Sequence, residues 1–431
     1  MSHRSRQLRV SSLARVEGEG ALRVVVRDGG VERADLRIYE PPRFFEALLR
    51  GRKYTEPPDI TARICGICPV AYQTSACWAI EDACGVVVDG PIADLRRLLY
   101  CGEWISSHAL HIYLLHVPDF LGYPDAITLA TDHREIVERG LALKKAGNAI
   151  LDLIGGRAIH PINVRVGGFY SAPPPDRMET LAEVLRKALD DALDTVRWVA
   201  GLDFPDLELD HELLAVRHPD RYAIESGTTV RRSAGADFPV DAFSNHVVEE
   251  QVPHSTALHA RLDGHRYLTG PLARYSLNHD LLSPLAQQAA ADAGLGPVCR
   301  NPFRSIVVRA VEIVYAVEEA LRLLESYEPP NPSSVEVPAR AGIGHGVSEA
   351  PRGLLYHRYE LDADGLIRDA TIVPPTSQNQ GAIEDDLRRV VSENLHLADE
   401  PLTALCERTI RNYDPCISCS THFLELIMVR R

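Results

Sequence analysis

The sequence predicts a mainly helical α+β fold, in which a central bundle of buried helices carries an amino-terminal antiparallel hairpin and small peripheral β lobes. Residues 92–116 are apolar nearly all round, which is typical of a buried helix. Residues 303–327 form a second long stretch, apolar enough to bury most of a helix surface. Residues 21–39 instead alternate about the turn Asp28-Gly29-Gly30, as the two strands of a hairpin do.

The other elements follow from local patterns. Proline pairs and triplets interrupt the chain, and Asn301-Pro302 is a plausible cap and first position for the second long helix. Residues 203–270 mix short alternating runs with turn residues and predict a small β-containing lobe. We find no repeats or clear linker, so residues 1–422 are expected to form one domain. The expected helices cover 44–51, 70–84, 92–116, 133–153, 179–199, 303–327 and 382–397, and further strands cover 353–359 and 370–373.

Composition excludes several classes of protein. A net charge of −14 argues against a nucleic-acid partner, which would require a basic face. The first ten residues contain no apolar run long enough for a signal peptide. No stretch reaches the roughly 20 apolar residues of a membrane span. We therefore expect a cytoplasmic protein, whose nine cysteines are metal ligands or buried thiols rather than disulfides.

Two Cys-x-x-Cys pairs lie at opposite ends of the chain, Cys65 with Cys68 and Cys416 with Cys419. A fold that joins them closes nearly the whole polypeptide into a loop, which costs conformational entropy. Four thiolates on a metal could offset that cost. The remaining cysteines are most simply buried small hydrophobic residues, and these are Cys77, Cys84, Cys101, Cys299 and Cys406.

The pairs allow three interpretations. A structural zinc site is the commonest fate of paired cysteines, although zinc ribbons place the second pair much closer to the first. A thioredoxin-like redox pair needs a βαβ context that neither pair has. A catalytic metal centre with an open coordination position predicts charged or proton-carrying residues nearby.

The residues around the pairs resemble the motifs of a known family. Residues 63–69 read Arg-Ile-Cys-Gly-Ile-Cys-Pro, and residues 414–422 contain Asp-Pro-Cys and Cys-Ser-Thr-His. With three further segments in the same order, the chain resembles the large subunit of nickel–iron hydrogenases along its whole length. The three further segments are Arg15 to Gly18, Gly155 to Gly168 and Glu349 to Gly353.

The resemblance implies a nickel–iron centre in which the iron carries cyanide and carbon monoxide. Cys65 and Cys416 would be terminal ligands of nickel, and Cys68 and Cys419 would bridge nickel to iron. Soft thiolates suit both metals. The implied reaction is heterolytic cleavage or formation of dihydrogen, with the Cys416 thiolate as first proton acceptor. Glu17 resembles the glutamate that carries the proton onward, although outside its motif it would be taken for a solvated turn residue.

Other site residues are implied in the same way. Arg352 matches an arginine suspended over the open side of the metals, where a guanidinium can hydrogen-bond cyanide or assist the base. Asp414 could pair with it, although Asp before Pro is also a plain turn former. Pro351, Pro375 and Thr376 match positions that line the cofactor, the last two in a cyanide-facing loop.

A second metal site is also implied. Glu46 and His422 fall where the family holds a magnesium or iron ion near the carboxyl terminus, and oxygen ligands suit magnesium. In the family a maturation endopeptidase cuts after the histidine that His422 matches, once nickel-insertion proteins have acted. We therefore expect residues 423–431 to be removed.

Two positions depart from the common pattern. Tyr72 stands where many members have histidine, and Ser107 aligns with an aspartate. The tyrosine resembles the cytoplasmic, NAD(P)-linked branch, sometimes called sulfhydrogenases. No further iron–sulfur pattern and no dinucleotide fingerprint appear in the chain. An iron–sulfur small subunit is therefore implied, with partners that carry further iron–sulfur clusters, flavin and NAD(P).

Alternatives remain open at this point. A metal-free structural subunit of a respiratory-type complex would share the scaffold, and a zinc-stapled interaction protein would share the cysteines. His108 and His111 are i, i+3 neighbours on an apolar helix and could bind a metal, but we expect packed core histidines.

Overall fold

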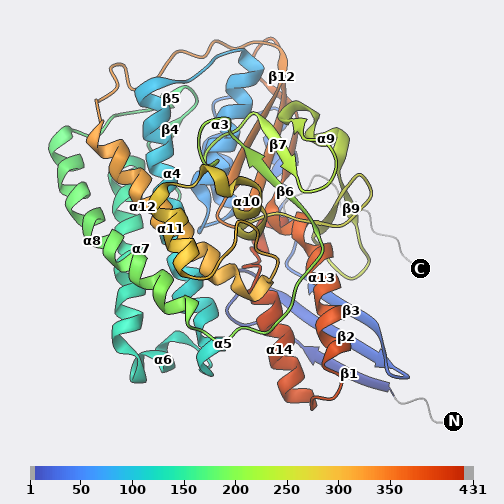
Figure 1. Ribbon diagram of the computed structural model, residues 1–431. Coiled ribbons are helices and arrows are strands. Elements are labelled where there is room, and N and C mark those ends of the chain that lie inside the picture. The colour runs from blue at the N-terminus through green and yellow to red at the C-terminus, as the bar shows by residue number, and fades with distance from the viewer. Residues whose placement is uncertain (1–4, 422–431) are drawn as a thin grey trace.

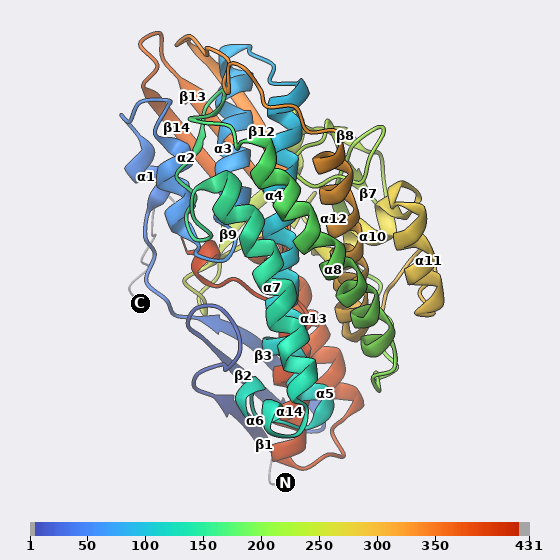
Figure 2. The same cartoon turned by 90° about the vertical axis from the view of Figure 1, so that its left-hand side faces the viewer.

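The computed structural model describes residues 5–421 and places a bundle of long helices beside three-stranded antiparallel sheets (Figure 1). The bundle consists of α4 (Gly90–Leu110), α7 (Arg134–Gly155), α8 (Pro175–Ala200) and α12 (Ser305–Glu325), which pack pairwise along their lengths (Figure 2). Most residues of α4 and α12 are buried. The predicted fold class, helix-dominated with peripheral β-structure, is confirmed.

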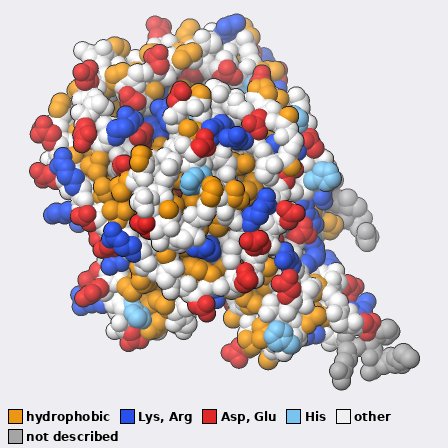
Figure 3. All heavy atoms as spheres, viewed as in Figure 1, with side chains coloured by type: hydrophobic (Ala, Val, Ile, Leu, Met, Phe, Trp, Pro, Cys, Tyr) orange, Lys and Arg blue, Asp and Glu red, His pale blue; other side chains and the backbone are white. Residues whose placement is uncertain are grey.

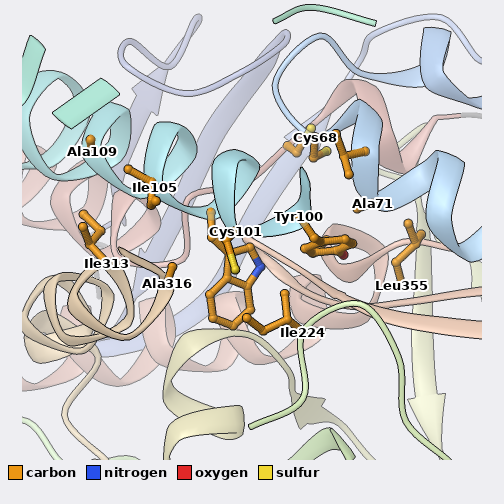
Figure 4. Packing of buried hydrophobic residues seen from close by; sticks show 14 of the residues in the cluster. Cys68, Ala71, Tyr100, Cys101, Ile105, Ala109, Ile224, Ile313, Ala316 and Leu355 are labelled. Carbon is orange, nitrogen blue, oxygen red and sulfur yellow. The ribbon is translucent and has the colours of Figure 1, made fainter. Parts of the chain in front are cut away.

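The apolar helix predicted over 92–116 is present with one irregularity. After α4 the chain continues without a break into a π-helix at His111–His116, and then into α5 (Val117–Leu121). Figure 4 shows Cys101, Ile105 and Ala109 of this helix facing Ile313 and Ala316 of α12. This apolar contact forms the centre of the core.

The amino-terminal hairpin is confirmed as β2 (Gly20–Arg27) and β3 (Gly30–Ile38). An additional strand, β1 (Ser5–Val10), pairs antiparallel with β2. Leu8 is the one buried side chain of β1, and the other five are wholly or partly exposed, because the strand lies at the edge of the sheet. A stretch of mostly exposed residues lacks the apolar alternation that predicts a strand, so only the polar character of this segment was apparent from the sequence.

A second sheet, in the order β12-β13-β14, covers α3 (Pro69–Cys84), which follows the first cysteine pair. The predicted strands 353–359 and 370–373 are present as β13 (Gly353–Leu361) and β14 (Ile367–Val373). The strand β12 (Gly342–Ala350) was not predicted, since glycines occupy alternate positions where strands normally carry large side chains. These glycines let the strand approach the α3 backbone closely.

Gly344 is therefore expected to tolerate no side chain. A Cβ atom there would overlap the Ala79 carbonyl oxygen and the Ala83 amide nitrogen, and neither backbone atom can move without shifting α3. We expect Gly344→Ala to destabilise the protein by about 1–3 kcal/mol, the usual cost of overpacking. Thermal unfolding of the variant measures this. Gly296→Ala is the matched control, because its nearest atom lies 3.9 Å away, and an equal loss in both variants would contradict the packing argument.

The helix α13 (Pro375–Glu393) begins seven residues earlier than predicted, so Pro375 and Thr376 form its first turn rather than a loop. It is followed by α14 (Asp399–Arg411), a helix not predicted from the sequence. The region 203–270 contains the expected small strands. The remaining helices are α1 (Phe45–Leu49), α2 (Pro57–Thr61), α6 (Ala126–Asp132), α9 (Phe243–His246), α10 (Pro271–Asn278) and α11 (Pro284–Asp292); the remaining strands are β4 (Val164–Arg165), β5 (Gly168–Phe169), β6 (Glu212–Arg217), β7 (Thr229–Arg232), β8 (Phe238–Pro239), β9 (Val247–Gln251), β10 (Leu258–Leu262) and β11 (Tyr267–Leu268).

One face of the molecule mixes charged and apolar side chains (Figure 3). Acidic and basic side chains are interspersed over the face seen in Figure 3, with apolar atoms between them. Within residues 5–421, no helix combines the length and the apolar character that crossing a membrane requires.

Candidate metal centre

The two cysteine pairs meet in the interior. Cys65 and Cys68 lie in the turn before α3, and Cys416 and Cys419 lie in the segment that follows α14. The Sγ atoms of Cys65 and Cys416 are 3.4 Å apart, and those of Cys68 and Cys419 are 3.7 Å apart. All four sulfurs lie within 4.8 Å of one another and all four residues are buried. The closest contacts thus join residues from opposite ends of the chain.

Backbone hydrogen bonds hold the carboxyl-terminal segment in place. Glu17 and Cys416 form an isolated parallel β-bridge, and the Ile417 amide donates to the Glu17 carbonyl at 3.0 Å. The Cys416 amide donates to the Thr376 hydroxyl at 2.9 Å. The first turn of α13 therefore positions one of the sulfurs.

The first pair is positioned by Glu103, which was not predicted from the sequence as a site residue. The Glu103 carboxylate, on α4, accepts from the Val70 and Ala71 amides at 2.6 and 3.1 Å. It thereby satisfies two of the unpaired N–H groups at the start of α3, directly after Cys68. Burial raises the pKa of Glu103 well above its usual range. In the sequence, the presence of a glutamate in an apolar helix was the one indication that Glu103 has a buried role.

The four thiols need a cation to ionise together. Burial raises the pKa of the Cys416 and Cys419 thiols. The hydrogen bond from Cys416 lowers the pKa of the Cys65 thiol. One thiolate is therefore stabilised by its protonated neighbours. A fully deprotonated set carries four negative charges, which metal ions can balance. The donor set therefore fits a nickel–iron pair. The sulfur spacing alone would also suit a zinc ion with Zn–S bonds of about 2.3 Å.

The surroundings differ from those of a closed zinc site, since a buried ion pair lies beside the sulfurs. Arg352 Nε donates to the Asp414 carbonyl at 2.7 Å, and Nη2 donates to the Asp414 carboxylate at 3.0 Å. Burial opposes the charged guanidinium, but Asp414 and the cysteine sulfurs outweigh it and raise the pKa of Arg352. The predicted pairing of these two residues is present in the structure.

Arg274, a second buried arginine, fixes the backbone before Arg352. Its guanidinium donates to the Ala350 and Pro351 carbonyls at 2.7 and 2.8 Å and is itself bound by Glu312. Arg274 was not predicted from the sequence, because an isolated arginine carries no local sign of burial.

Glu17 contacts the centre directly. Its Oε2 atom lies 3.2 Å from the Cys416 sulfur and accepts from the Ser418 amide at 3.0 Å. Burial raises the pKa of this carboxyl. A protonatable group thus touches one ligand sulfur.

The two unusual positions are both buried. The Tyr72 ring packs at 5.7 Å from that of His357 and is buried. Burial, with the nearby cysteine sulfurs, raises the pKa of Tyr72 well above its usual range. The Ser107 hydroxyl has no hydrogen-bond partner among residues 5–421. The ion pair with Asp414 gives Arg352 a counter-charge in the absence of an aspartate at position 107.

The expected second metal site is described only in part. Glu46, on α1, is buried, and its Oε1 atom accepts from the Ile372 amide at 2.7 Å. His422 and the tail 423–431 lie outside the described residues.

The core histidines bind protein groups, as expected. His108 contacts Glu312 at 3.0 Å, and His111 contacts the Arg411 carbonyl at 2.8 Å. The five remaining cysteines are buried and free.

Comparison with known proteins agrees with this geometry. The family model described as nickel-dependent hydrogenase matches residues 43–138 and 260–422. Sulfhydrogenase 1 subunit alpha of Pyrococcus furiosus is 36% identical over 97% of this chain and 98% of its own. The NAD-reducing hydrogenase HoxS subunit beta of Cupriavidus necator is 30% identical over 97% of this chain and 95% of its own. A crystal structure of an NAD+-reducing [NiFe]-hydrogenase in the H2-reduced state superposes with a TM-score of 0.87 at 27% identity, covering 97% of this chain and 99% of that one.

Proposed function

This chain belongs to the nickel-dependent hydrogenase family, and from that premise we propose which of its residues hold the metals and move the proton. The chain is the large subunit of a hydrogenase, an oxidoreductase acting on hydrogen. The observation that carries the assignment is the convergence of four buried sulfurs from the two ends of the chain.

Cys65 and Cys416 are proposed as terminal nickel ligands, and Cys68 and Cys419 as the ligands shared with iron. The two closest sulfur contacts support this division, because each joins one residue from each pair. When bound, an electron-rich nickel–iron pair with cyanide and carbon monoxide on iron supplies the chemistry that splits dihydrogen heterolytically. The protein supplies a buried site that excludes water from the sulfurs.

Glu17 takes the proton from Cys416 and passes it outward. The 3.2 Å contact between its carboxylate and the sulfur supports this role. Arg352, held by Asp414, places a positive charge beside the sulfurs, and its guanidinium would supply hydrogen-bond donors to cyanide ligands when the centre is bound. Pro351 and the first turn of α13, with Pro375 and Thr376, complete the lining of the site.

The second ion, magnesium or ferrous iron, is proposed to bind Glu46 and His422. The burial of Glu46 supports an interior site. We further propose that residues 1–422 form one domain and that a maturation endopeptidase removes residues 423–431 once nickel-insertion proteins have acted.

Electrons leave through partner subunits. Relatives of this chain are named as subunits of hydrogenases that include an NAD-reducing enzyme and sulfhydrogenases. We infer a cytoplasmic complex with an iron–sulfur small subunit and with partners that carry further clusters, flavin and NAD(P).

Metal analysis with infrared spectroscopy tests the proposal. The purified complex is expected to contain nickel and iron in the large subunit, with absorption bands in the cyanide and carbonyl stretching region. Zinc alone at this site would support the alternative of a zinc-stapled interaction protein. A site without metal would support the alternative of a metal-free structural subunit. Either result would overturn the ligand assignment.

A further inference from the structure

A second cluster of metal-binding side chains lies away from the four cysteines. His254, His259 and Glu384 offer ligand atoms that all lie within 4.8 Å of one another. His254 follows β9, His259 is on β10 and Glu384 is on α13, so the β9–β10 hairpin and α13 converge at the cluster. His254 Nε2 donates to Glu384 Oε1 at 2.7 Å, and the two imidazole rings are 5.6 Å apart at 89°.

One nitrogen atom of the cluster has no hydrogen-bond partner among the described residues. His259 is 5% exposed, and its Nε2 atom has no hydrogen-bond partner among residues 5–421. Buried polar atoms almost always have a hydrogen-bond partner. An unpaired imidazole nitrogen beside a carboxylate therefore indicates that a bound group belongs there. A bound cation would satisfy it.

The protonation states suit a metal. Burial lowers the pKa of His259 to about 4, so its imidazole is neutral at pH 7. Burial opposes ionisation of Glu384, but the pKa of this carboxyl is lowered, chiefly by the hydrogen bond from His254 and also by that from the Leu36 amide. A neutral imidazole and an ionised carboxylate are the forms that bind metal, so little proton release is needed.

We propose that His254, His259 and Glu384 bind a divalent transition-metal ion of the zinc class, separate from the nickel–iron centre. Two imidazoles and one carboxylate suit zinc and leave a coordination position open, whereas magnesium and calcium prefer oxygen ligands alone. Glu384 lies eight residues after Thr376 on α13, roughly 12 Å along the helix axis. The site is therefore distinct from the cysteine cluster.

The cavity beside the site and the nearby arginines determine which ligand could fill the open coordination position of the ion. His254 lines a surface cavity of about 400 Å³, together with Arg9, Arg23 and Arg37. Arg388 also lies 4.0 Å from the other oxygen of Glu384. These positive charges oppose a bare cation and favour an anionic fourth ligand, such as a small carboxylate, on the bound ion.

The ion would join three parts of the fold. Glu384 also accepts from the Leu36 amide at 3.1 Å, so the site links β3, the β9–β10 hairpin and α13. The first turn of α13 in turn holds the Cys416 amide through Thr376. Zinc at this site would thus brace the helix that positions a nickel ligand.

Equilibrium dialysis of the purified complex against buffered free Zn2+ tests the proposal. The wild type is expected to bind zinc in addition to its nickel and iron. His254→Gln and Glu384→Gln should each weaken zinc binding by at least about 100-fold, since loss even of outer-shell partners costs about 10–100-fold. His246→Gln is the matched control, because His246 also pairs with a carboxylate, Asp263 at 3.0 Å, but lies outside the cluster.

Nickel content is measured in every variant, so that zinc loss at unchanged nickel separates this site from misfolding and from the cysteine centre. Wild-type zinc affinity in both cluster variants, or equal loss in His246→Gln, would overturn the proposal. Crystals of the wild-type complex soaked in zinc provide a test without variants. An anomalous scattering peak between the three side chains is expected, and its absence at this position would also overturn the proposal.

Discussion

Replacing Cys416 with alanine is expected to abolish nickel binding and hydrogen turnover together. Cys416 is fully buried, and its sulfur lies 3.4 Å from that of Cys65, so alanine removes one of the four sulfur donors of the centre. Loss of an outer-shell partner alone lowers metal affinity by about 10–100-fold, and loss of a direct ligand should exceed that range. Nickel content and hydrogen-dependent dye reduction measure the two effects.

Cys406→Ala is the matched control for this prediction. Cys406 is also fully buried, but it lies on α14 away from the four-sulfur cluster. Its replacement should leave nickel content unchanged and cost only the modest stability of a small cavity. If Cys416→Ala retained nickel at the wild-type level, Cys416 would not be a ligand.

Replacing Glu17 with glutamine is expected to slow proton exchange while leaving the metals in place. Glutamine keeps the size of the side chain and its carbonyl oxygen can still accept from the Ser418 amide, but it cannot carry a proton. Loss of a positioned acid–base group typically costs about 10²–10⁴-fold in rate. Hydrogen–deuterium exchange catalysed by the purified complex measures the effect, and nickel content reports that the centre is intact.

Glu19→Gln is the control here, because Glu19 lies on the same turn but is exposed. It should leave exchange unchanged. Full exchange activity in Glu17→Gln would remove Glu17 from the relay, and the contact with Cys416 would then have only a structural role. Loss of nickel in Glu17→Gln would instead show that the side-chain contact between Glu17 and Cys416 holds the ligand segment.

Elements with strong periodicity were predictable, and elements formed through packing were not. The long helices α4 and α12 bury most of their residues, so their apolar composition is visible locally. The glycine-rich strand β12 exists because its bare backbone fits against α3, a contact between residues far apart in sequence. The early start of α13 has a similar origin, since Thr376 is held there by the Cys416 amide.

The site shows the same division. The two cysteine pairs, Glu17 and Arg352 stand in recognisable motifs, and the chemistry of thiolates, carboxylate and guanidinium follows from residue type. Glu103 and Arg274 have no such motif. Their roles arise from where α4 and α10 place them, against the start of α3 and the backbone before Arg352.

The sequence by itself determined the family, the helical class and the donor atoms, because these depend on residue identity and local order. The tertiary structure alone decided which sulfurs approach each other across the whole chain, which buried charges hold them, and that His254, His259 and Glu384 form a cluster. These features depend on contacts between distant segments, and such contacts form only when burial of the whole core repays the entropy of closing the chain.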